Sequence, residues 1–208
     1  MKPVVKIFIT FIPLILILLL VPTSNSSAYT RFHGKYTQTP YNTYYWNGVD
    51  QIPTINAPLY VDNAMSMWNN TSNTRIWMVK TTNQSASILD FHSKVLEDIN
   101  ILGRTTWWVG NSTVDPKTTN WYWAKVEMNK NSPYSSIPNP KGVYNGNIVF
   151  AAAVAHEIGH ALGLAHNSSY FDIDTLMFFD FIFYTDYGIY YPTNDEILGV
   201  RNIYGYLY

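Results

Sequence analysis

The chain contains no cysteine, and only 13% of its 208 residues are charged. Without cysteine there can be no disulfide scaffold, no thiol nucleophile and no zinc site built on thiolates. The 13 basic and 14 acidic residues leave a net charge of -1, which gives no electrostatic reason to expect nucleic acid as a partner. The apolar fraction of 47% is too high for a disordered chain. We therefore expect a domain that folds around a hydrophobic core.

The first 28 residues have the layout of a secretory signal. Two lysines precede residues 7–21, which are almost entirely apolar, and residues 26–28 are small. A membrane-spanning helix needs about 20 apolar residues, and this stretch has 15. We therefore expect cleavage after Ala28 and export of residues 29–208 as one secreted domain, with membrane contact only if the segment stays uncleaved. The sequence does not indicate an oligomeric state.

Hydrophobic periodicity and turn signals predict an α+β domain. The expected strands cover residues 41–46, 75–82, 87–95, 102–109 and 121–128, and the expected helices cover about 59–70, 148–162 and 193–204. The first helix has one apolar stripe from Val61 to Trp68. The last helix begins with a capping box from Thr193 to Glu196, and Gly205 ends it.

Three of the five histidines lie between positions 156 and 166. His156 and His160 are four residues apart, so on a helix both imidazoles project from one face and can reach one metal ion. Glu157 is rotated by about 100° around the helix and can approach the open side of the metal. Gly163 can adopt the positive φ that ends a helix, after which His166 can supply a third nitrogen. Three imidazoles and a water form an open zinc site of the catalytic type.

Residues 156–166 resemble the long zinc signature of the metzincins, and His-Glu-Ile-Gly-His-Ala-Leu-Gly-Leu is similar to the matrixin branch, the matrix metalloproteinases and their microbial relatives. Residues 175–177 (Thr-Leu-Met) resemble the Met-turn, in which Met177 would pack under the imidazoles, and residues 195–205 resemble the matrixin C-terminal helix. The resemblance covers most of residues 41–205. It implies a metzincin-like catalytic domain with a twisted, mostly parallel five-stranded sheet, an active-site helix and a C-terminal helix.

In function, the resemblance implies a secreted zinc endopeptidase that acts on protein or peptide substrates. His156, His160 and His166 would hold one Zn²⁺, and Glu157 would be the general base that takes a proton from the attacking water. The substrate would lie extended along an edge strand and pair with its backbone. By resemblance, that edge consists of Leu102, Gly103, Arg104, Thr105 and Thr106.

The chain also departs from the family pattern. It has no cysteine that could keep the zinc inhibited from a pro-segment. Outside the signature only His33 and His92 remain, so a loop with a second, structural zinc is not visible. No proline closely follows Met177, and the usual wall of the primary specificity pocket is therefore not recognisable. Phe179 stands where some metzincins have a tyrosine ligand.

The same residues also allow other interpretations of the site. The site could belong to a peptidase with one narrow target, such as wall peptides or a single partner protein. It could also belong to an exported, aromatic-rich binding module that keeps a metal without turnover, although Glu157 would then serve no purpose. Glu196 could replace His166 as third ligand only if the spacing from Gly163 to His166 were ignored.

Calcium is a further candidate cofactor. Four aspartates in the C-terminal part of the chain could bind it, namely Asp172, Asp174, Asp180 and Asp186. They lack the spacing of an EF-hand loop, so the sequence gives calcium no support and favours solvated loops.

Overall fold

The computed structural model describes residues 29–207, so the expected signal segment 1–28 lies outside the described residues. The described chain contains one sheet with strand order β2-β1-β3-β6-β4-β5. The strands are β1 (Tyr41–Gly48), β2 (Trp77–Thr81), β3 (Leu89–Lys94), β4 (Gly103–Val109), β5 (Ser112–Val114) and β6 (Trp123–Asn129).

The sheet is mostly parallel, as predicted. β1 runs parallel to β2 and β3, and β3 runs parallel to β6, whereas β4 is antiparallel to both β6 and β5. The sheet has six strands rather than the expected five, because β4 turns back into the short strand β5. With three residues, β5 is too short to show an alternating pattern, and the sequence had placed it in a polar loop.

In the described part of the chain, three long helices accompany the sheet, and their positions agree with the prediction within two residues. They are α2 (Ala57–Asn69), α3 (Gly146–Ala161) and α5 (Asn194–Tyr204); shorter elements are α4 (Ile182–Thr185) and the 3-10 turns η1 (Gln84–Ala86), η2 (Tyr134–Ser136) and η3 (Tyr170–Asp172). The helix α2 begins earlier than its apolar stripe because Pro58 fits a first helical turn. The capping box of Thr193 and Glu196 is confirmed.

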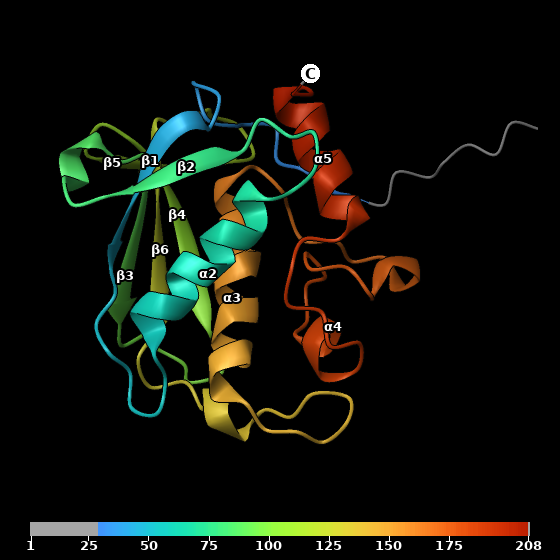
Figure 1. Ribbon diagram of the computed structural model, residues 1–208. Coiled ribbons are helices and arrows are strands. Elements are labelled where there is room, and N and C mark those ends of the chain that lie inside the picture. The colour runs from blue at the N-terminus through green and yellow to red at the C-terminus, as the bar shows by residue number, and fades with distance from the viewer. Residues whose placement is uncertain (1–28, 208) are drawn as a thin grey trace, which may run out of the picture.

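Figure 1 shows α2 and α3 packed against one face of the sheet, with the C-terminal segment (orange to red) on the other side of α3. Fourteen of the 16 residues of α3 are buried. The indole of Trp68 on α2 donates to the carbonyl of Ala155 on α3 at 2.9 Å, which ties the two helices together. A helix that is enclosed on all sides is a rigid support for side chains at its C-terminal end. Within residues 29–207, no helix combines the length and apolar character needed to cross a bilayer.

Candidate active site

The two histidines of α3 are fixed by backbone carbonyls. His156 Nδ1 lies 2.7 Å from the oxygen of Leu176, and His160 Nδ1 lies 2.9 Å from the oxygen of Leu164. A carbonyl only accepts, so each Nδ1 must carry the proton and each Nε2 presents a lone pair. Phe183 stacks on the His156 ring at 5.5 Å between centroids. Both imidazoles are thus held in the orientation and the tautomer that a metal ligand requires.

A turn after α3 brings the third histidine to the other two. Gly163 has φ of 100°, in the region that favours glycine, and the chain then reverses. His166 Nε2 ends 3.1 Å from His156 Nε2 and 3.0 Å from His160 Nε2. The segment is held in place because Asn167 N donates to Met177 O at 2.8 Å. The geometry that the sequence predicted for this turn is therefore present.

The nitrogen cluster fits zinc. Zn–N bonds of about 2.0–2.1 Å in a tetrahedral site place two ligand nitrogens about 3.3 Å apart, close to the two separations observed. A proton on His166 Nε2 could bridge to one neighbouring lone pair but not to both, whereas a cation satisfies all three nitrogens. Burial lowers the pKa of His156 and His160 to about 3, so both are neutral, as metal binding requires. These three residues form the only group with metal-binding geometry among residues 29–207.

The Met-turn packs against α3, the helix that carries two of the three histidines. Met177 is 2% exposed, and its sulfur packs against Gly159 of α3, where any side chain would collide with it. The backbone N–H of Met177 donates to Oε1 of Glu196 at 3.0 Å, while Oε2 of the same carboxylate caps α5. Glu196 is fully buried and lies outside the ligand group, so it anchors the turn and is not a ligand. The capping-box pattern in the sequence predicted only the contact that Oε2 makes at the start of α5. It gave no indication that Oε1 of the same carboxylate accepts from Met177.

Glu157 lies between two cavities. One has a volume of about 480 Å³ and is bordered by Phe32, Trp107 and His160, and the other has about 310 Å³. Both are lined by Glu157 and His166. The smaller cavity is walled by four phenylalanines of the C-terminal segment, Phe178, Phe179, Phe181 and Phe183. The sequence did not reveal this wall, because its residues meet only after the segment has folded over α3.

The predicted substrate strand has a free edge. β5 pairs only with Trp107–Val109 of β4, and no other strand of residues 29–207 pairs with the first half of β4 on that side. Asn129 N donates to Leu102 O at 3.0 Å, so the even-numbered residues at the start of β4 direct their backbone groups toward β6. The N–H and C=O groups of Gly103 and Thr105 consequently point to the free side. Leu102 lies just before β4, and Arg104 and Thr106 hydrogen-bond through the backbone to β6.

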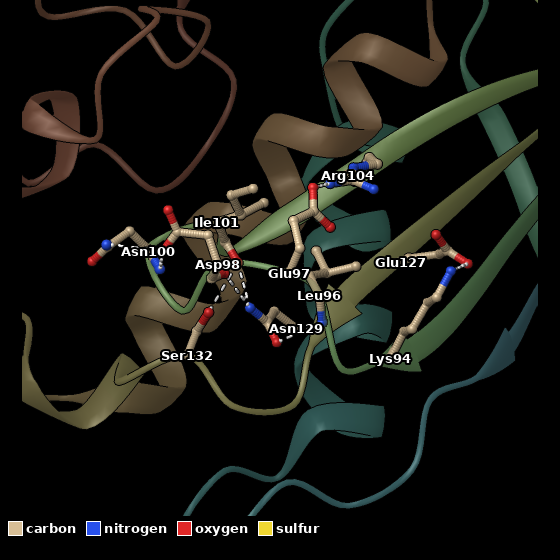
Figure 2. Close-up of polar contacts among 10 residues, drawn as sticks. All are labelled: Lys94, Leu96, Glu97, Asp98, Asn100, Ile101, Arg104, Glu127, Asn129 and Ser132. Atoms are coloured by element: carbon tan, nitrogen blue, oxygen red, sulfur yellow. Dashed lines mark hydrogen bonds and ion pairs between the residues drawn. The ribbon is translucent and has the colours of Figure 1, made fainter.

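The loop between β3 and β4 is fixed by hydrogen bonds that sequence reasoning missed (Figure 2). The side chain of Asn129, which is fully buried, donates to the carbonyls of Asp98 and Ile101 at 2.9 Å each and accepts from Leu96 N at 3.2 Å. Ser132 Oγ also donates within this loop, and Figure 2 shows the loop folded around both side chains. The loop that leads into the edge strand is thus held by a buried amide and a hydroxyl.

The matrixin family model matches residues 38–205, most of the chain. The chain belongs to the matrixin family. Matrixins are zinc metallopeptidases, and the cluster of His156, His160 and His166 is compatible with the zinc site of such an enzyme. Comparison with curated proteins finds none that matches.

Proposed function

We propose that this matrixin is a secreted zinc endopeptidase in which Glu157 is the general base. The observation that carries the proposal is the convergence of three imidazole Nε2 atoms beside Glu157, at the border of two cavities and next to a free strand edge. A purely structural zinc site would be closed by a fourth protein ligand and would need neither a neighbouring carboxylate nor adjoining cavities.

The residues divide the reaction between them. His156, His160 and His166 would hold the zinc, which would supply a Lewis acid able to lower the pKa of a water to about 7 and to polarise a carbonyl. Leu176 O and Leu164 O keep the imidazoles of His156 and His160 oriented by accepting hydrogen bonds from their Nδ1–H groups. Glu157 accepts a proton from the attacking water and then donates it to the departing amine. Its partial enclosure, at 8% exposure, limits competing contact with bulk water.

The substrate would lie along the free edge of β4. The backbone groups of Gly103 and Thr105 point outward there and can pair with an extended peptide. Both cavities adjoin Glu157 and His166, so a substrate bound there would have space for residues on both sides of the scissile bond. This arrangement favours cleavage within a chain over removal of a terminal residue.

The smaller cavity would select one substrate side chain. Its phenylalanine wall and its volume of about 310 Å³ suit a bulky apolar residue next to the scissile bond. A peptide library cut by the protein should show an aliphatic or aromatic residue enriched at one position beside the cleaved bond. Equal cleavage regardless of both flanking residues would show that this cavity does not select substrates.

Digestion of casein tests the function itself. The purified protein should release peptides, a zinc chelator should stop the release, and added zinc should restore it. Zinc-loaded protein that leaves casein and an unbiased peptide library intact would favour the binding module over an enzyme. Cleavage of only a few related peptides would instead indicate the narrow-target peptidase.

Secretion rests on residues 1–28 and has its own test. N-terminal sequencing of the protein collected from the medium of cells that express the full chain should begin at Tyr29. Retention in the cell with residues 1–28 intact would contradict the proposed export.

A further inference from the structure

A hydroxyl of the edge strand contacts the proposed general base. Thr105 is 7% exposed, and its side chain points from β4 toward α3. Its Oγ1 lies 2.7 Å from Oε2 of Glu157 and 2.9 Å from the backbone oxygen of the same residue. Among residues 29–207, no other side chain hydrogen-bonds to this carboxylate. The hydroxyl of Thr105 is therefore the hydrogen-bond donor that can fix the orientation of the base.

A second residue of β4 limits the same side chain from another direction. A Cβ at Gly103 would lie 2.8 Å from Cγ of Glu157 and 3.3 Å from its Cδ. Glycine is thus the residue that lets the strand backbone approach the carboxylate so closely. Gly103 and Thr105 alternate with Arg104 along the strand, so both face Glu157 while Arg104 faces the opposite side.

The start of β4 is itself fixed. Leu102 O accepts from Asn129 N at 3.0 Å and from the hydroxyl of the buried Tyr134 at 2.7 Å. The preceding loop is held by Asn129 and Ser132, as Figure 2 shows. The position of Thr105 relative to α3 is therefore set by the sheet and does not depend on Glu157.

We propose that Thr105 is a positioning residue, whose hydroxyl holds the carboxylate of Glu157 in the orientation from which it acts on the attacking water. This inference rests on the proposed function. It connects the edge strand that receives the substrate with the base, because Thr105 offers its backbone groups to the outside and its hydroxyl to Glu157.

The contact of Thr105 with one carboxylate oxygen also suits both forms of the base during turnover. While Glu157 is a carboxylate, the Thr105 hydroxyl donates to Oε2 and leaves Oε1 free to take the proton from water. Once Oε1 carries that proton, Oε2 is a carbonyl oxygen and still accepts from the Thr105 hydroxyl. Each form of Glu157 then has a hydrogen-bond partner, and no proton is gained or lost by Thr105.

Thr105→Val tests this role, since valine keeps the shape of threonine and removes only the hydroxyl. We expect kcat on a peptide substrate to fall by at least about tenfold, a fraction of what general-base catalysis contributes. KM should stay within about twofold, because the outward backbone groups of residue 105 are unchanged. The zinc content should remain that of the wild type. Thr105→Ser, which restores the hydroxyl, should return kcat to within about threefold of the wild type.

Thr74→Val is the matched control. Thr74 is also buried, at 3% exposure, and its hydroxyl is hydrogen-bonded to Thr71 outside the site. The control should lose thermal stability to a similar extent as Thr105→Val while keeping kcat. Gly103→Ala provides a second variant, and its added methyl group should lower kcat by displacing Glu157 even though Thr105 is present.

The outcomes separate this inference from the proposed function. A wild-type protein without proteolysis would refute the function, whatever the variants do. An active wild type with unchanged kcat in Thr105→Val, or with serine no better than valine, would overturn the positioning role alone. Equal losses of kcat in Thr105→Val and Thr74→Val would show that the hydroxyl only supports folding.

Discussion

The two sides of Glu157 are built in different ways. On the metal side, every histidine orientation is set by a backbone carbonyl or by a turn within 20 residues of the motif, and the imidazoles of α3 are buried. On the substrate side, the walls come from β4, from the β3–β4 loop and from the phenylalanines after the Met-turn. The metal side is local and rigid, whereas the substrate side is assembled from distant segments and stays open along the edge of β4.

As a result, the residues that bind zinc and transfer the proton are different from those that select the substrate. Zinc binding and proton transfer need fixed nitrogens and a fixed carboxylate, and a helix followed by a turn provides them. Recognition of a substrate needs an accessible backbone edge and a cavity, and loops can change these without moving the metal. Thr105 and Gly103 are the points at which the two sides meet, because both contact Glu157 from the edge strand.

The largest expected effect is on the metal side. Glu157→Gln keeps the shape of the side chain but removes its ability to accept a proton, so hydrolysis should fall by about a thousandfold or more while zinc stays bound. Peptide turnover and zinc content measured on the same sample check this. Undiminished turnover would show that another group is the base.

The second-largest effect is expected from the removal of His166, the one exposed residue of the three histidines. His166→Ala leaves only two imidazoles, so zinc affinity should fall by at least about a hundredfold, more than the loss of a supporting hydrogen bond causes. Zinc content after dialysis against a weak chelator is the measurement. Retention equal to that of the wild type would remove His166 from the ligand set and would show that the metal side is not completed by the turn after α3.

A smaller effect is expected on the substrate side. Peptides with N-methylated amides next to the scissile bond cannot pair with the outward backbone groups of Gly103 and Thr105, and kcat/KM should fall about tenfold. The unmodified parent peptide and the same peptide with the methyl group placed several residues away are the controls. Similar cleavage of all three peptides would exclude β4 as the binding edge.

The same difference explains what could be predicted from the sequence. The spacing of His156, His160 and His166, the helix, the glycine turn and the capping box are each visible within a short stretch of sequence. All of these have the predicted geometry in the structure. The strand β5 was missed because three residues show no period. The hydrogen bonds of Thr105 to Glu157 and of Glu196 to Met177 join residues 52 and 19 positions apart, and no short pattern records such contacts.

X-ray absorption at the zinc edge of the purified protein measures directly which atoms surround the metal. We expect one zinc per chain, with three imidazole nitrogens and one oxygen at about 2.0–2.1 Å. A protein without stoichiometric zinc, or a zinc with fewer than three imidazoles around it, would refute a catalytic site built on His156, His160 and His166.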